Sequence, residues 1–250
     1  MVIDYKKEGR IAIFTINRPE AMNALSEEVH QKLNAAMTDF RDDPELWVAI
    51  LTGAGDRAFS AGQDISSFRP GPMGKRVSAY NLADKIWKPF IAAINGYALG
   101  GGLELALTCD IRIAADHARL GQPEVNIGFM TGGGGSQRLP RFLPRAIAAE
   151  MLLTGRMIDA QEALRIGLVN RVVPLAQLMT TAREIAETIC QKGPLGVRAT
   201  KEAMVRGYSM PLDEGLKLEF DLSEALRSTE DYMEGAKAFV EKRKPAYRGK

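Results

Sequence analysis

Residues 95–110, NGYALGGGLELALTCD, decide the fold class because three consecutive glycines join an apolar segment to a helix-forming run. A strand, a glycine-rich turn and a helix in this order leave backbone N–H groups free at the helix N-terminus. These groups and the positive end of the helix dipole attract negative charge, and glycine lets a ligand approach the backbone closely. The stretch therefore predicts an anion-binding turn in an α/β protein. The alternative is a tight turn that only allows close helix packing.

Common anion-binding and nucleophile motifs do not fit these glycines. No Lys-Ser or Lys-Thr follows them, as a phosphate-binding P-loop requires, and residues 100–105 read GGGLEL rather than GxGxxG. The GxSxG elbow of serine hydrolases is absent, and the chain has only 2 His. The sequence therefore argues against a nucleotide phosphate and against a serine-derived tetrahedral intermediate as the bound anion.

Short, β-branched apolar runs alternate with helical patterns in the first part of the chain. Buried strands are expected at residues 11–16, 47–53, 90–95 and 110–115. Between the first two strands, Ser26 is placed to cap a helix. The apolar face of this helix consists of Val29, Leu33, Met37 and Phe40. The alternation of strands and helices predicts an α/β fold with mainly parallel strands.

Helical patterns dominate after Arg145, and residues 175–190 read as a long amphipathic helix that ends before Gly193-Pro194. The last part of the chain carries apolar residues at helical spacing. Such helices are not expected to stand alone in water, so they should pack on the core or on another subunit. We expect a core at residues 1–192 and a helical region at residues 193–250.

The composition is that of a globular protein: 250 residues, 46% hydrophobic and 26% charged, with a formal net charge of +2. This balance argues against a nucleic-acid binder, and no apolar run approaches the roughly 18 residues that span a membrane. Cys109 and Cys190 have no CxxC partners, so free thiols are expected. With no apolar signal core at the N-terminus, we expect a cytoplasmic protein without a metal site.

Two more turn-forming segments accompany the triple glycine. Residues 58–65, AFSAGQDI, follow the expected strand at 47–53. Residues 121–141, GQPEVNIGFMTGGGGSQRLPR, place Glu124 ahead of a second glycine run, as Glu104 follows the first one. Three turns after strands, two of them with an embedded Glu, are able to form one site at the ends of the strands.

Five segments in this order resemble the crotonase superfamily, and enoyl-CoA hydratases in particular. They are NRPEAMNALS, AFSAGQDI, KPFIAAINGYALGGGLELALTCDIRIA, GQPEVNIGF with GGGGSQRLPR, and the terminal AFVEKRKPAY. The resemblance spans nearly the whole chain and implies a spiral core of ββα repeats. It also implies that residues 193–250 form a helical trimerisation region, with trimers that pair into hexamers.

The resemblance implies a site that binds acyl-CoA and polarises its thioester carbonyl with two backbone N–H groups. By matching motifs, these belong to Gln63 and Gly101. Gln is a less usual residue at the first position, where Ala or Gly is common. Glu104 and Glu124 match the two acid–base residues of the hydratases. We assign Glu104 as the base that activates water and Glu124 as the proton donor, although the sequence does not fix this division.

The resemblance also suggests how the CoA moiety is held. Arg18 lies where the family contacts CoA, and the segment of Ala61, Gln63, Asp64 and Ile65 matches the lining of the adenine pocket. Phe239 and Lys242 match residues that reach the CoA of an adjacent subunit. For each cation, the alternative is an ordinary solvated surface charge.

Acyl specificity is expected from residues 66–88 and 129–131. The family often has Pro where Thr131 stands. The residues that could line an apolar acyl tunnel, or be ordinary core, are Met73, Tyr80, Trp87, Phe129 and Met130.

The expected reaction is the reversible hydration of a 2,3-enoyl-CoA thioester to a 3-hydroxyacyl-CoA, as in fatty acid and acyl-CoA degradation. No cofactor is expected, because coenzyme A is part of the substrate. One alternative is another crotonase reaction, such as isomerisation or the hydration of a cyclic or dienoyl-CoA. Another is a non-catalytic CoA-binding assembly protein, against which the intact glutamates and glycines argue.

Overall fold

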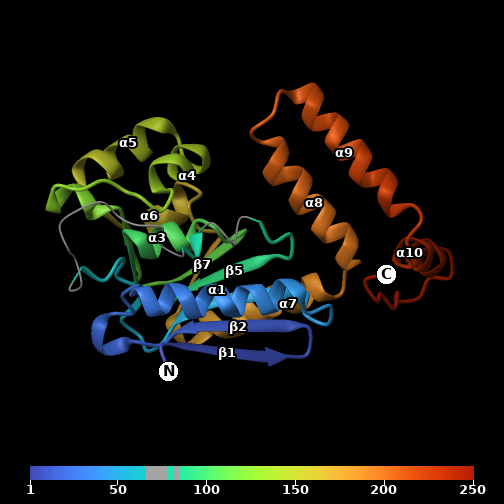
Figure 1. Cartoon of the computed structure of the whole chain (residues 1–250), viewed down its shortest axis with the longest axis horizontal. Helices are drawn as coiled ribbons and strands as arrows, with labels where there is room; N and C mark the ends of the chain where they lie inside the picture. The colour runs from blue at the N-terminus through green and yellow to red at the C-terminus, as the bar shows by residue number, and fades with distance from the viewer. Residues whose placement is uncertain (66–77, 81–84) are drawn as a thin grey trace.

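The computed structural model describes residues 1–65, 78–80 and 85–250, which form two β-sheets with flanking helices (Figure 1). The strands are β1 (Ile3–Glu8), β2 (Ile11–Ile16), β3 (Val48–Gly53), β4 (Ala58–Ser60), β5 (Phe90–Ile94), β6 (Tyr97–Leu99), β7 (Ile111–Ala115), β8 (Arg119–Gly121), β9 (Met157–Asp159) and β10 (Arg171–Val173). The larger sheet has the order β1-β2-β3-β5-β7-β10 and the smaller sheet the order β4-β6-β8-β9. Only β1 in the larger sheet and β9 in the smaller one pair antiparallel to their neighbours.

The helices cover both sheets and form the end of the chain. The α-helices are α1 (Glu27–Asp42), α3 (Gly101–Ala106), α4 (Gly135–Phe142), α5 (Arg145–Thr154), α6 (Ala160–Arg165), α7 (Leu175–Cys190), α8 (Pro194–Gly207), α9 (Leu212–Leu226) and α10 (Glu230–Val240). Two short 3-10 helices are η1 (Pro19–Ala21) and η3 (Pro123–Ile127). Within the described ranges, no helix is both long enough and apolar enough to cross a membrane.

Both faces of the larger sheet are buried, which explains why its strands read as continuous apolar runs. On one face, alternate residues such as Phe14 and Phe90 pack with Phe40 of α1, with ring centroids 5.9 Å and 5.2 Å from that of Phe40. On the other face, alternate residues such as Ile50 and Ile91 share a cluster with the buried side of α7. Fully burying a side chain of this size contributes about 1.5–3 kcal/mol, so this core fixes the sheet on which the site is built.

The chain passes three times from the larger sheet to the smaller one, from β3 to β4, from β5 to β6 and from β7 to β8. A single residue separates β6 from α3, and a single residue separates β8 from η3. Since β6 and β8 are parallel neighbours, these two turns lie side by side, and the Gly100 N–H donates to the Gly121 carbonyl at 2.9 Å. This is the ββα repeat arrangement that the resemblance implies.

Most sequence expectations on the local structure agree with the fold. The four expected strands coincide with β2, β3, β5 and β7 to within one residue at each end. Ser26 caps α1 by accepting a hydrogen bond from the Val29 N–H at 3.3 Å, and the predicted apolar face of this helix is buried. The helix expected at residues 175–190 is α7, and Pro194 opens α8.

The sequence analysis did not predict the strands of the smaller sheet. Its strands β4, β6, β8 and β9 have three residues each, too few to display a period of two. The sequence analysis also missed β1, because IDYKKE is an edge strand whose last three residues, Lys6, Lys7 and Glu8, are charged and exposed.

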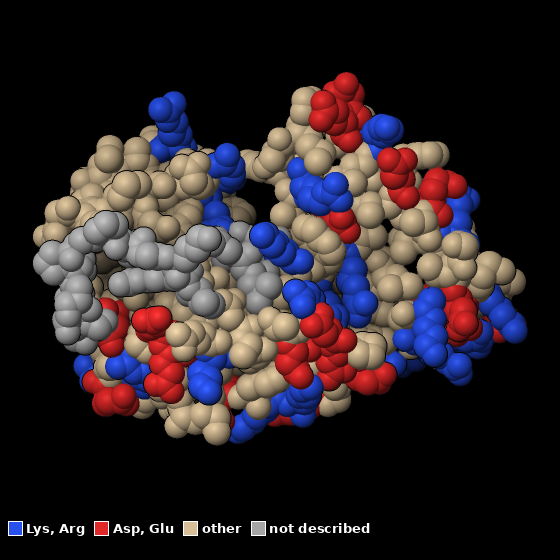
Figure 2. Space-filling model, viewed as in Figure 1, with Lys and Arg blue, Asp and Glu red and all other residues tan. Residues whose placement is uncertain are grey.

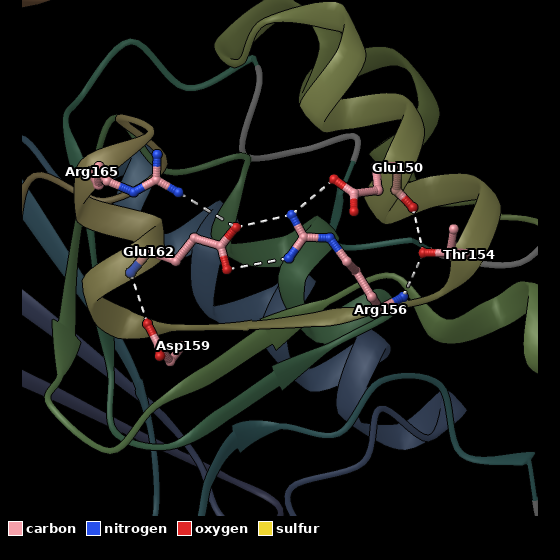
Figure 3. A network of polar contacts seen from close by, with 6 residues as sticks. All are labelled: Glu150, Thr154, Arg156, Asp159, Glu162 and Arg165. Carbon is pink, nitrogen blue, oxygen red and sulfur yellow. Dashed lines mark hydrogen bonds and ion pairs between the residues drawn. The ribbon is translucent and has the colours of Figure 1, made fainter.

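An ion-pair network joins α5, β9 and α6 (Figure 3). The Arg156 guanidinium donates to both carboxylate oxygens of Glu162, at 2.9 Å and 3.2 Å, and to Glu150 at 3.2 Å. Asp159 caps α6 by accepting a hydrogen bond from the Glu162 N–H at 2.8 Å. Because β9 pairs with β8, the network holds the strand that leads directly into η3.

The last three helices form an arm at the end of the chain. Figure 1 shows α8 and α9 side by side next to the core, with α10 at the side of the molecule away from α3. Figure 2 shows a notch between this arm and the rest of the chain. None of the side chains of α9 is buried, and Leu212, Leu216 and Phe220 are 78%, 55% and 64% exposed. The arm therefore presents a wide apolar surface.

Candidate active site

The triple glycine places one backbone N–H at the N-terminus of α3. Gly100 has φ of 51° and ψ of −124°, a conformation that side chains disfavour, and it turns the chain from β6 into α3. Gly101 is the first residue of α3, so its N–H has no partner within the helix. No hydrogen-bond acceptor for this N–H exists in the part of the chain that the structure describes.

A second N–H group comes from the AFSAGQDI segment. Leu25 and Gln63 form a parallel bridge, in which the Leu25 N–H donates to Gly62 and the Asp64 N–H donates to Leu25. The Gln63 N–H is skipped by this pattern and has no acceptor among the described residues. A Cβ placed on Gly101 would lie 3.4 Å from the Gln63 nitrogen. The two free N–H groups are therefore neighbours.

Glu104 lies in the apolar interior of α3 and is 3% exposed. One oxygen of its carboxylate, Oε1, accepts hydrogen bonds from the backbone N–H groups of Gly133 and Gly135 at 2.7 Å and 2.8 Å. Burial raises the pKa of Glu104, and these two hydrogen bonds oppose the rise because they favour the charged form. The second glycine run thus supports the ionised state of Glu104.

Glu124 lies in η3, beside the turn that carries Gly101. A Cβ on Gly100 would lie 3.2 Å from Glu124 Oε1, so the carboxyl group lies directly against this glycine. Burial, and after it the charge of Glu104, raise the pKa of Glu124 to about 7. The two glutamates therefore have different environments: backbone hydrogen bonds oppose the effect of burial at Glu104, whereas the charge of Glu104 adds to it at Glu124.

Gln122 is fully buried next to Glu124. With its amide nitrogen turned toward the carboxylate, Gln122 donates to Glu124 Oε1 at 3.0 Å and to Oε2 at 3.2 Å. The sequence analysis quoted this residue within GQPE and assigned no role to it. The sequence could have indicated this contact, because Gln122 stands two residues before Glu124 at the end of a strand, and a buried amide needs a polar partner.

The residues expected to hold CoA lie around the first turn of the chain. Arg18 Nη1 donates to the Ala24 carbonyl at 2.8 Å and to the Asp64 carboxylate at 2.9 Å, with both side chains largely buried. Ala61 is exposed, and Ile65 is 63% exposed. The structure therefore joins Arg18 to the AFSAGQDI segment, while contact with CoA stays a prediction.

Phe239 and Lys242 are not brought to this site within one chain. Phe239, in α10, is 86% exposed, and Lys242 lies two residues after the end of this helix. Figure 1 shows α10 well away from α3. Their expected role at the CoA of an adjacent subunit therefore remains a prediction.

The expected acyl-binding residues are described only in part. Residues 66–77 and 81–84, with Met73 among them, lie outside the described residues. Tyr80 is buried beside the site, whereas Trp87 is half-buried. Phe129 and Met130 are 54% and 61% exposed, so neither lines an enclosed tunnel in a single chain.

Comparisons with known proteins identify the family to which the chain belongs. A sequence model of the enoyl-CoA hydratase/isomerase family matches residues 6–250. The chain is 47% identical over 257 residues to (E)-benzylidenesuccinyl-CoA hydratase of Thauera aromatica, with 100% of both chains covered. It is 43% identical over 248 residues to the short-chain-enoyl-CoA hydratase of Clostridium acetobutylicum, covering 96% of this chain and 94% of that protein.

A solved structure shares the fold. The crystal structure of an enoyl-CoA hydratase from Bacillus anthracis superposes with a TM-score of 0.95 at 40% identity, covering 100% of both chains. The chain belongs to the enoyl-CoA hydratase/isomerase family of enzymes. The predicted crotonase-like α/β fold is thereby confirmed.

Proposed function

We propose that the protein adds water reversibly across the 2,3-double bond of an enoyl-CoA thioester to give a 3-hydroxyacyl-CoA. This proposal rests on one observation: two free backbone N–H groups lie close to two carboxyl groups with different pKa values. The N–H groups belong to Gln63 and Gly101, and the carboxyl groups belong to Glu104 and Glu124. The relative named short-chain-enoyl-CoA hydratase supports the same reaction.

The proposed mechanism divides the work between main chain and side chains. The thioester oxygen gains negative charge as water adds, and the N–H groups of Gln63 and Gly101 stabilise it. Glu104, whose charged form is favoured by hydrogen bonds from the Gly133 and Gly135 N–H groups, takes a proton from the attacking water. Glu124 delivers its proton to the α-carbon. After the reaction, the pair still holds one proton, so the reverse reaction uses the same residues.

We propose that the CoA moiety lies along the segment of Ala61, Asp64 and Ile65, close to the Arg18 side chain. The pairing of Arg18 with Asp64 supports this by giving the segment a fixed shape. No cofactor beyond the CoA carried by the substrate enters the mechanism.

A second candidate is the hydration of a bulkier enoyl-CoA. The relative named (E)-benzylidenesuccinyl-CoA hydratase covers the whole chain at 47% identity, which favours this candidate. Isomerisation of a double bond is disfavoured, because the site retains two carboxyl groups for water addition.

The test is the loss of enoyl absorbance when the purified protein is incubated with crotonyl-CoA. We expect rapid loss for the wild type and a decrease of about 10²–10⁴-fold in kcat for Glu104→Gln and for Glu124→Gln. Glu28→Gln, an exposed change on α1, is the matched control and should retain full activity. A wild type that binds CoA and hydrates neither crotonyl-CoA nor a bulky enoyl-CoA would refute the proposal.

A further inference from the structure

Tyr80 is a polar residue that lies inside the site and has no role in the mechanism above. It is 8% exposed, and its ring meets the ring of His30 edge-on at a centroid distance of 5.3 Å. A Cβ on Gly133 would come within 2.6 Å of Cε2 of the Tyr80 ring. The ring is therefore held between α1 and the glycine run that supports Glu104.

The Tyr80 hydroxyl lies beside the backbone that carries the two free N–H groups. A Cβ built on Gly101 would overlap this hydroxyl, and the same position lies 3.4 Å from the Gln63 nitrogen. The hydroxyl thus shares one small volume with the Gly101 and Gln63 backbone. An apolar acyl tunnel would not need a polar group at this point, and a Phe would fill the same space.

This hydroxyl is available as a donor. Within residues 1–65, 78–80 and 85–250, no acceptor takes a hydrogen bond from it, although the ring is buried. Burial and the charges of Glu104 and Glu124 raise the Tyr80 pKa above its ordinary value. The hydroxyl therefore keeps its proton at any pH at which the two glutamates operate.

His30 also holds the Tyr80 ring in position. His30 is 7% exposed, and its Nε2 lies 3.1 Å from the Gln63 side-chain oxygen. His30 therefore contacts both the Tyr80 ring and the residue that supplies one free N–H. A donor fixed in this way needs little reorganisation when charge develops on a bound oxygen.

We propose that Tyr80 is a third hydrogen-bond donor to the thioester oxygen, beside the backbone N–H groups of Gln63 and Gly101. The proposal rests on the proposed hydratase function and adds a catalytic side chain to it. Tyr80 transfers no proton: its O–H bond stays intact and only strengthens its hydrogen bond as the oxygen becomes negative. The effect is therefore expected in kcat rather than in substrate binding.

The test uses Tyr80→Phe, which removes the hydroxyl and keeps the ring. With crotonyl-CoA, we expect kcat to fall by about 10- to 100-fold and KM to change by less than about 3-fold. Tyr5→Phe is the matched control, because it removes a hydroxyl that donates to Asp39 at 2.7 Å on the outer side of α1. This control should keep the wild-type kcat.

A second readout separates a donor from a merely structural residue. A chromophoric thioester, 4-(dimethylamino)cinnamoyl-CoA, absorbs at longer wavelength when its carbonyl oxygen is polarised. We expect a smaller red shift on Tyr80→Phe than on the wild type and on Tyr5→Phe. An unchanged kcat would overturn the proposal, and so would a lowered kcat with an unchanged red shift. The wild-type rate tests the proposed function by itself, so the two failures are distinguishable.

Discussion

At the scale of single residues, the properties of the site depend on the burial and the hydrogen bonds of two carboxyl groups. Glu104 is the more deeply buried of the two, and two backbone N–H groups partly compensate its charge. Glu124 is less buried and has its pKa at about 7. Burial is the largest cause of the raised pKa of both glutamates, and the hydrogen bonds from the second glycine run offset part of it at Glu104.

The sequence pointed to Glu104, Glu124, Gln63 and Gly101 through their motifs, but could not assign the proton to one glutamate. The donors to Glu104 come from residues 29 and 31 positions further along the chain. No local pattern around Glu104 reveals them, since their placement depends on the packing of α3 against the second glycine run. The free hydroxyl of Tyr80 is likewise a result of tertiary packing.

The pair of glutamates predicts a pH profile. The active state holds one proton, so kcat/KM should fall as pH rises through the Glu124 pKa of about 7. Hydration and dehydration share this state, because each returns the pair with the same number of protons. Measuring kcat/KM in both directions from about pH 5 to about pH 9 should give the same falling limb on the alkaline side, with the same apparent pKa. On the acid side, protonation of Glu104 should lower kcat/KM in both directions.

Gln122→Met provides the internal check on this profile. It removes the amide that faces the Glu124 carboxylate, so the charged form is less stabilised and the falling limb should move to higher pH. A limb that stays in place in this variant, or that differs between the two directions, would contradict the assignment of Glu124 as the titrating group.

At the scale of elements, glycine contacts determine where α3 lies. A Cβ on Gly102 would overlap the Ser60 carbonyl oxygen, so α3 rests backbone-to-backbone on β4. A side chain at this point would push the helix away from the strand, together with the N–H of Gly101. The sequence showed three glycines and a helix here. It could not show which glycine serves packing and which serves the site, because β4 itself was too short to recognise.

Gly102→Ala should therefore be strongly destabilising. We expect the free energy of unfolding to fall by about 1–3 kcal/mol, as is typical when a packed core is overfilled. Denaturant unfolding measures this change. Gly132→Ala is the matched control, since a Cβ on Gly132 meets nothing within 4 Å, and its effect should stay within about 0.5 kcal/mol. Equal stabilities for the two variants would show that α3 does not depend on this contact.

At the scale of the whole molecule, the arm of α8, α9 and α10 is the part that a single chain does not explain. Its apolar side chains were visible in the sequence as helical spacing. Their exposure became visible only in the structure, because α9 buries none of its residues. We propose that other copies of the chain cover this surface, in a closed trimer or a hexamer.

An assembly of this kind would place Phe239 and Lys242 at the site of a neighbouring subunit, and mixed trimers test this placement. Lys242→Ala should raise KM for an enoyl-CoA by about 10-fold, as expected for the loss of one contact with a charged group. Glu104→Gln should have almost no activity. When the two variants are unfolded together and reassembled in equal amounts, a Lys242→Ala subunit with intact Glu104 can receive Lys242 from a Glu104→Gln neighbour. About one quarter of all sites should then show the wild-type KM, given random assembly around a three-fold axis. If Lys242 instead serves its own subunit, no mixture can contain such a site, and the steady-state curve will show only the raised KM.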